Sequence, residues 1–161
     1  MRRLIVSLLF IILIGTGFSL LLFAHSSPSA EPVIINNTAV PPVPTANSQT
    51  VARGSLLYAL QCASCHGANL EGVPDWKKPL PDGSFPAPPH DSSGHTWHHP
   101  DTVLLGVIAN GGNPESHSTM PAFKDKLNTE EMNAILAFFK SKWGRDEREY
   151  QWWMTVTRSA P

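Results

Sequence analysis

The stretch Cys62-Ala63-Ser64-Cys65-His66 holds both cysteines of the chain, with a histidine directly after the second. This spacing matches a haem attachment site, in which two thiols bond the haem and the adjoining imidazole ligates its iron. A zinc site needs about four ligands; there is no second cysteine pair, although loop histidines could complete such a site. A thioredoxin-type pair follows a buried strand, whereas the residues before Cys62 are expected to be helical. A disulfide alone explains neither His66 nor the spacing, so the stretch favours covalent haem attachment.

The residues before this stretch extend its pattern. Gly54, Tyr58 and Cys62 recur at intervals of four, which places them on one face of a helix. With these residues and the cysteine–histidine stretch, residues 48–144 resemble the class I c-type cytochromes, small all-α haem proteins that carry single electrons. The resemblance implies a cytochrome c fold of three to five helices around one covalent haem c. It also implies that Gly54 lets the C-terminal helix cross in close contact.

Two later helices are indicated by their ends. Asn128 can cap a helix, with Glu131 three residues later in a capping-box arrangement and Leu127 placed as a hydrophobic staple. The apolar face of this helix consists of Met132, Ile135, Leu136, Phe139 and Trp143. Gly144 can end it. An earlier helix is predicted over about 102–110, between a proline and a glycine pair.

The resemblance also implies a second axial ligand, for which Met120 is the candidate. Met120 lies after the predicted second helix and is followed directly by Pro121, a setting similar to the distal ligand loop of the family. His117 is the alternative, and its binding in place of methionine would lower the reduction potential. The predicted site is therefore Cys62 and Cys65 for covalent attachment, with His66 and Met120 as ligands of the haem iron.

The segment from 70 to 100 departs from the family. It has no hydrophobic periodicity and many prolines, so it predicts a long loop. The resemblance implies that one proline packs beside the proximal histidine and that a tryptophan or tyrosine bonds a haem propionate; the candidates are Pro86, Pro88 and Trp97. The histidines clustered here are His90, His95, His98 and His99. They could hold copper or zinc, but bonds to propionates, backbone or water are the favoured interpretation.

The N-terminal segment predicts a membrane anchor over residues 1–24. Residues 4–23 carry no charge, and twenty residues form a helix of about 30 Å, enough to span a bilayer. Arg2 and Arg3 precede them, so the positive-inside rule places the haem domain on the periplasmic or outer side of the cell membrane. A cleaved signal peptide is the alternative, and it too would export the chain.

The rest of the chain divides at residue 50. Residues 25–50 hold five prolines, one charged residue and no aromatic residue, which predicts a Pro-rich linker. Residues 51–161 are the predicted cytochrome c haem domain. Its tail after Gly144 either extends the last helix and wraps onto the domain or presents its aromatic residues to a partner.

Charge and composition narrow the function. Twelve basic and 13 acidic residues give a net charge of −1, without the basic surplus of a nucleic-acid-binding protein. No catalytic acid, base or nucleophile is evident, so the prediction is not an enzyme but a membrane-tethered electron carrier between respiratory-chain components. Its expected partners are redox proteins, such as a respiratory complex or oxidase. The alternatives are a gas or peroxide sensor or enzyme with an open sixth haem site, and a fixed haem subunit of an oxidase or dehydrogenase complex.

Overall fold

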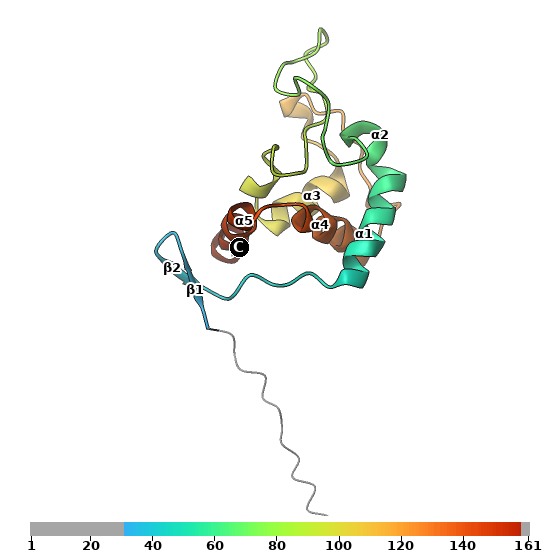
Figure 1. Ribbon diagram of the computed structural model, residues 1–161. Helices are drawn as coiled ribbons and strands as arrows, with labels where there is room; N and C mark the ends of the chain where they lie inside the picture. Colours follow the sequence, from blue (N-terminus) through green and yellow to red (C-terminus); the bar gives the residue numbers. More distant parts are fainter. Residues whose placement is uncertain (1–30, 159–161) are drawn as a thin grey trace, which may run out of the picture.

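The computed structural model describes residues 31–158. In chain order the elements are β1 (Val33–Ile35), β2 (Thr38–Val40), α1 (Ser48–Gln61), α2 (Ala63–His66), a 3-10 turn (Thr96–His98), α3 (Asp101–Asn110), a second 3-10 turn (Pro114–Ser116), α4 (Thr129–Ser141) and α5 (Arg145–Arg158). The described residues are thus mainly helical, with five α-helices, which confirms the helical part of the prediction (Figure 1). Among them, no helix combines the length and the apolar character that a membrane span requires. The predicted anchor over 1–24 lies outside the described residues.

Helices α1 and α4 cross in direct contact at Gly54. A Cβ added at this position would collide with the backbone carbonyl of Ala134 in α4. One turn later Tyr58 is buried, and its ring centroid lies 5.5 Å from that of Phe138 and 5.8 Å from that of Phe139. The close crossing implied by the resemblance is present. It accounts for a glycine in the middle of a helix, where glycine costs roughly 0.5–1 kcal/mol relative to alanine.

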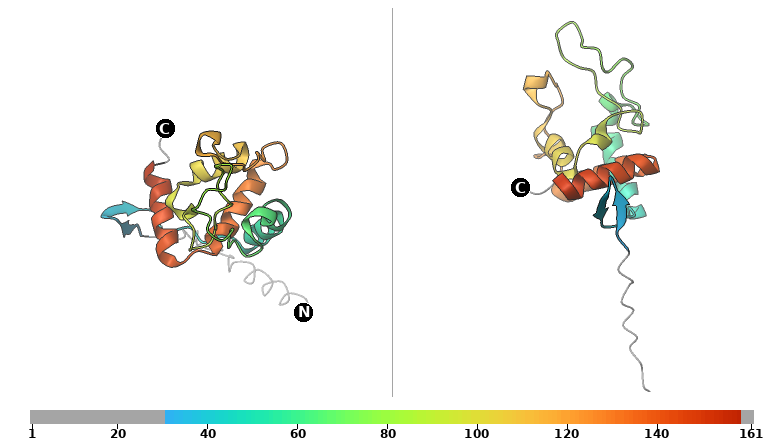
Figure 2. Two further views of the ribbon diagram at one scale, coloured as in Figure 1. Left: turned by 90° about the horizontal axis from the view of Figure 1, so that it is seen from above. Right: turned by 90° about the vertical axis from the view of Figure 1, so that its left-hand side faces the viewer.

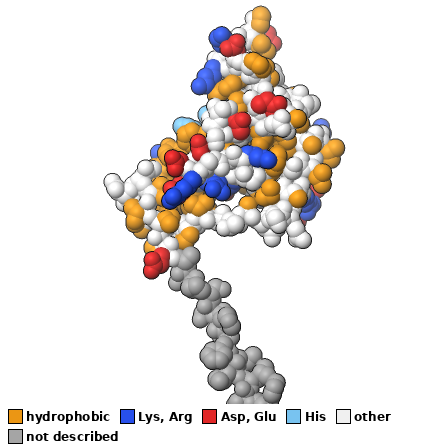
Figure 3. All heavy atoms as spheres, in the orientation of Figure 1, with side chains coloured by type: hydrophobic (Ala, Val, Ile, Leu, Met, Phe, Trp, Pro, Cys, Tyr) orange, Lys and Arg blue, Asp and Glu red, His pale blue; other side chains and the backbone are white. Residues whose placement is uncertain are grey.

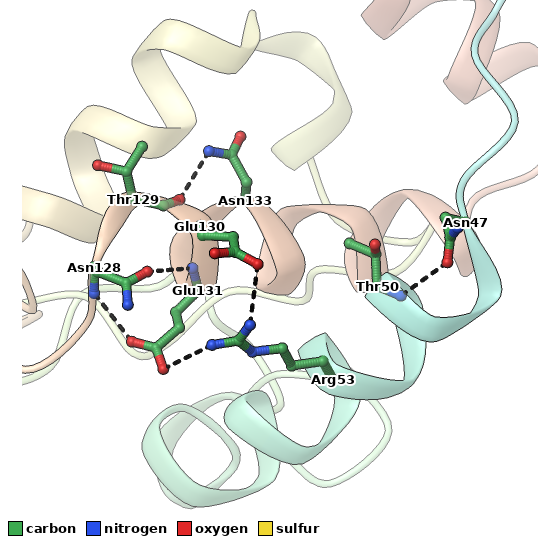
Figure 4. A network of polar contacts seen from close by, with 8 residues as sticks. All are labelled: Asn47, Thr50, Arg53, Asn128, Thr129, Glu130, Glu131 and Asn133. Carbon is green, nitrogen blue, oxygen red and sulfur yellow. Dashed lines mark hydrogen bonds and ion pairs between the residues drawn. The ribbon is translucent and has the colours of Figure 1, made fainter.

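Asparagine caps begin both crossing helices. The Asn128 side chain accepts a hydrogen bond from the Glu131 N–H at 2.9 Å, and the Glu131 carboxylate accepts from the Asn128 N–H at 3.0 Å, so the predicted capping box is confirmed. Asn47 caps α1 by accepting two backbone N–H bonds, at 2.8 and 3.3 Å. Arg53 of α1 reaches the α4 cap and pairs with Glu130 at 3.1 Å and Glu131 at 3.2 Å (Figure 4). Exposed pairs of this kind add little stability, but they fix how the two helices meet.

The remaining helices lie close to their predicted ranges. Helix α3 spans Asp101–Asn110, against about 102–110 predicted. Helix α4 ends at Ser141 rather than at Gly144. The tail after Gly144 forms the separate helix α5, which does not extend α4 but packs back onto the domain. Of the two expectations for the tail, the structure therefore shows the one in which it wraps onto the domain.

A partly buried carboxylate joins α3, α4 and α5. Lys140 Nζ lies 2.6 Å from Oδ1 of Asp101, the first residue of α3. The Gln151 side chain is only 1 % exposed, and its Nε2 donates to the same oxygen at 2.6 Å. The Thr155 hydroxyl donates to it as well, at 3.2 Å. Asp101 thus neutralises the lysine and satisfies a buried amide that has little access to water.

Replacing Asp101 by alanine is expected to lower the free energy of unfolding by about 2–3 kcal/mol, because the partly buried Lys140 would lose its counter-charge and the buried Gln151 would lose the shortest of its hydrogen bonds. Urea unfolding of the purified chain measures the change. Lys78→Ala is the matched control: it breaks an ion pair with Asp75 in which both side chains are exposed, and no measurable change is expected. Equal stabilities of the two variants would contradict the structural role of Asp101.

Residues 33–40 form an antiparallel hairpin within the segment predicted to be a linker. Its turn is made by Asn36 and Asn37, with φ angles of 48° and 59°. Two consecutive left-handed residues match a tight hairpin turn, and asparagine tolerates this conformation better than most residues. The sequence signal for this hairpin is the Asn-Asn pair between two short runs rich in β-branched residues. The overall proline-rich composition of residues 25–50 points to a linker instead.

The hairpin lies against α5 (Figures 1 and 2). Val40 is buried, and the indole N–H of Trp152 in α5 donates to the Pro41 carbonyl at 2.6 Å. Helix α1 then begins at Ser48, three residues before the predicted domain boundary. The described part of the 25–50 segment, residues 31–50, is therefore attached to the domain through the buried Val40 and the bond between Trp152 and Pro41.

Candidate functional site

The cysteine–histidine stretch lies where α1 ends and α2 begins. The Cys62 N–H donates to the Tyr58 carbonyl at 2.9 Å and ends α1. The Cys62 carbonyl then accepts the N–H groups of Cys65 at 3.1 Å and His66 at 3.0 Å. One tight turn therefore gathers the two thiols and the imidazole.

The thiols do not have the character of a redox-active pair. Both cysteines are free. Burial, and secondarily the neighbouring Cys65, raises the pKa of Cys62 to about 11. Catalytic Cys-x-x-Cys motifs instead lower the pKa of one thiol to about 3.5–7.5. The pair also follows a helix rather than a strand, so the surroundings disfavour thioredoxin-type chemistry.

His66 is buried and held by a loop residue. Its Nδ1 lies 2.9 Å from the Pro88 carbonyl oxygen, which can only accept, so Nδ1 bears the hydrogen. Burial lowers the pKa of His66, which keeps the imidazole neutral. In this tautomer Nε2 has a lone pair for a metal, the usual state of a ligating histidine whose other nitrogen is anchored. Of the candidate prolines Pro86 and Pro88, the structure brings Pro88 to the histidine.

The chain leaves α2 through a turn that Tyr58 stabilises. The Tyr58 hydroxyl donates to the Gly67 carbonyl at 2.6 Å. Burial raises the pKa of Tyr58, so the phenol remains a donor throughout the physiological range. Gly67 has a φ of 81°, a conformation that glycine adopts without strain. The residue one turn before Cys62 therefore also fixes the backbone just after His66.

Tyr58→Phe is expected to lower the free energy of unfolding by about 1–2 kcal/mol, because a part-buried carbonyl loses its strong donor while the ring packing is kept. Thermal or urea unfolding of the purified chain measures the loss. Tyr150→Phe is the control, since within residues 31–158 the Tyr150 hydroxyl makes no hydrogen bond and its ring contacts would remain. A Tyr58→Phe variant as stable as Tyr150→Phe would show that the hydroxyl does not support the turn.

Met120 lies in a strap that the end of α3 positions. The Gly112 N–H donates to the Met120 carbonyl at 3.0 Å, and the Phe123 N–H donates to the Ile108 carbonyl at 3.1 Å. A Cβ at Gly111 would crowd the Met120 carbonyl, so the strap approaches α3 closely. Met120 is half-buried and packs against the same hydrophobic core as Cys62. The strap thus brings the predicted second ligand to the core against which Cys62 also packs.

The alternative ligand His117 lies differently. It is exposed, in a left-handed conformation with φ 56° at the end of the second 3-10 turn. Its N–H donates to the Pro114 carbonyl at 2.9 Å. Of the two candidate ligands, Met120 is therefore the more buried.

Of the clustered histidines, His95 and His99 meet edge to face, with ring centroids 5.6 Å apart. The His95 ring stacks on Trp76 at 5.0 Å, and the His98 ring lies 3.7 Å from that of Trp97. His90 alone turns inward, toward His66. In the part of the chain from 31 to 158, no group of three or more His, Cys, Asp and Glu side chains is arranged to hold a metal ion.

Two further contacts of the loop 70–100 were not anticipated. The Trp97 indole, considered above for a propionate, donates to the Gly94 carbonyl at 3.1 Å. Trp143, expected only as an apolar residue of α4, donates its indole N–H to the His90 carbonyl at 2.8 Å. The Trp97 contact lies within the loop itself. No periodic signal could have found the Trp143 contact, because it joins an irregular loop to a residue just past α4, about fifty positions away.

These residues fit a covalently attached haem. The fit rests on two thiols one helical turn apart, a neutral buried imidazole with a free Nε2, and a thioether packed on the same core. A comparison with protein-family models matches residues 51–143 to the family described as "Cytochrome c". No curated protein and no solved structure matches the chain.

Proposed function

The chain belongs to the cytochrome c family, and on that basis we propose that it is a membrane-tethered carrier that passes single electrons between respiratory-chain components. Family membership itself makes the chain a haem electron-transfer protein with covalently bound haem c. When bound, the haem supplies reversible one-electron chemistry, which axial ligands, burial and nearby hydrogen bonds tune.

Four residues would hold the haem in this proposal. Cys62 and Cys65 would attach it through thioether bonds, and His66 Nε2 and Met120 Sδ would be the axial ligands of the iron. The observation that supports it best is the 2.9 Å contact between His66 Nδ1 and the Pro88 carbonyl. This contact sets the tautomer and the direction of Nε2, as second-shell partners do at metal sites.

An N-terminal anchor would keep the domain at the extracytoplasmic surface of the cell membrane. The uncharged run over 4–23 and the preceding Arg2 and Arg3 support this location. A cleaved signal peptide would give the same side of the membrane without the tether.

Redox proteins, such as a respiratory complex or oxidase, are the partners that we propose. Basic and acidic side chains are interspersed over the face drawn in Figure 3, and the whole chain has a net charge of −1. Such a surface supports recognition of a protein better than binding of nucleic acid, which uses an extended basic face. Electron transfer needs no acid, base or nucleophile, and we propose no enzymatic activity.

The test is an optical redox titration of the full chain, purified from membranes in detergent with its haem attached. A single one-electron transition, covalent haem after denaturation, and slow, incomplete binding of carbon monoxide to the reduced protein are expected. Rapid and complete binding of carbon monoxide would instead indicate an open sixth site and a sensor or enzyme. Loss of the chain from membranes in an alkaline wash would contradict the anchor, and a constant stoichiometry with oxidase or dehydrogenase subunits would indicate a fixed subunit.

A further inference from the structure

One histidine of the loop lies directly against the predicted proximal ligand. The ring of His90 stacks on that of His66, with centroids 4.1 Å apart and planes inclined by 28°. On its other side the His90 ring stacks on Phe139 of α4, at 4.5 Å and 19°. Three nearly parallel rings thus run from the site into the core.

His90 is fixed by bonds to three further segments. Its Nδ1 lies 2.8 Å from the hydroxyl oxygen of the buried Thr96. Its backbone N–H donates to the Leu70 carbonyl at 2.8 Å, and its carbonyl accepts the Trp143 indole N–H at 2.8 Å. The ring therefore cannot turn without breaking contacts to the loop and to α4.

The nature of the Thr96 contact explains why the residue is a histidine. The Thr96 hydroxyl donates to the Pro89 carbonyl at 3.4 Å, so its lone pairs remain to accept from Nδ1–H of His90. Imidazole has a flat face for stacking and an in-plane donor for anchoring. Leucine has neither, and phenylalanine has only the face.

We propose that His90 is a positioning residue that fixes the plane of the His66 imidazole by stacking on it while Thr96 holds its edge. This inference rests on the proposed role of His66 as an axial ligand. The Pro88 carbonyl holds one edge of the His66 ring, and a stacked neighbour prevents the ring from rotating about that bond. Outer-shell partners of ligating histidines orient them in this way.

The test compares haem-loaded full-length variants in the ferric state, by proton NMR of the haem methyl groups. The spread of these resonances depends on the plane of the axial imidazole. His90→Leu removes both the ring that stacks on His66 and the hydrogen bond to Thr96, so the order of the haem methyl resonances is expected to change. The ratio of reduced to oxidised protein at a fixed mediator potential should rise about two- to tenfold, the size of one lost aromatic contact, because less polar surroundings disfavour the more charged ferric form.

Further variants separate the effect of the stacked ring face of His90 from that of its hydrogen bond to Thr96. His90→Phe keeps the face and should retain the methyl order with a smaller change in reduced fraction. Thr96→Val removes the anchor and should shift the methyl resonances in the same sense as His90→Leu, but less. His95→Leu is the control: His95 belongs to the same cluster but stacks on Trp76, so wild-type values are expected.

Wild-type methyl resonances in both His90→Leu and Thr96→Val would overturn the proposal, as would equal shifts in His95→Leu. If His90→Leu does not fold, His90→Phe and Thr96→Val decide the question by the same readout. The ferric spectrum of His66→Ala distinguishes the two levels of inference. An unchanged spectrum of His66→Ala would refute His66 as a ligand. A changed spectrum would support it, and wild-type results for the His90 and Thr96 variants would then refute only the positioning role of His90.

Discussion

Gly54→Ala is expected to destabilise the haem-loaded protein by about 2–3 kcal/mol, although alanine is the better helix former. The added methyl group would meet the carbonyl carbon and oxygen of Ala134, which belong to the backbone of α4 and cannot rotate away. The two helices would have to move apart, and the packing of Tyr58 on Phe138 and Phe139 would loosen with them. Urea unfolding, followed by far-ultraviolet circular dichroism, measures the loss.

Gly106→Ala is the matched control. Gly106 also lies within a helix, α3, but an added Cβ would have no heavy atom within 4 Å. Without a steric cost, the helix preference of alanine should leave stability unchanged or raise it by up to about 1 kcal/mol. Stabilisation of both variants alike would show that the crossing at Gly54 is looser than described.

Met120→Ala should convert the proposed six-coordinate iron site into one with an open position. The expected results are loss of the weak long-wavelength band of ferric methionine ligation, a lower reduction potential, and rapid binding of carbon monoxide to the reduced protein. The backbone of the strap should be retained, since its bonds to α3 use the Met120 carbonyl and the Phe123 N–H. Optical spectra of the oxidised and reduced variant test all three results.

Two controls accompany this variant. Met154→Leu changes a buried methionine of α5 outside the strap, and the wild-type ferric band is expected. His117→Ala removes the alternative ligand and should also leave the band unchanged. Persistence of the band in Met120→Ala, or its absence from the wild type, would rule out Met120 as the ligand.

The helices and much of the candidate site could be predicted because they depend on local spacing. Gly54 and Tyr58 repeat every fourth residue before the attachment stretch, and the Asn128 cap requires only a residue three positions away. These patterns operate within one or two helical turns. Proximity in sequence then corresponds to proximity in space.

The loop and the N-terminal hairpin could not be predicted in the same way. The choice of Pro88 over Pro86, and the contact of His90 with His66, depend on how an aperiodic loop crosses a distant helix. The hairpin depends on α5, more than a hundred residues away, because two strands of three residues need such a partner to be stable.

The attachment of the hairpin to α5 limits how far the haem domain can travel in the membrane-tethered arrangement proposed above. With Pro41 held by Trp152, the stretch between the proposed anchor and the hairpin is the eight residues 25–32 instead of the predicted 25–50, and eight residues span at most about 30 Å. Within such a radius, a membrane partner alongside the anchor would meet the domain at an effective concentration on the order of millimolar. Electron delivery would then depend on lateral encounters within the bilayer rather than on diffusion through the surrounding compartment.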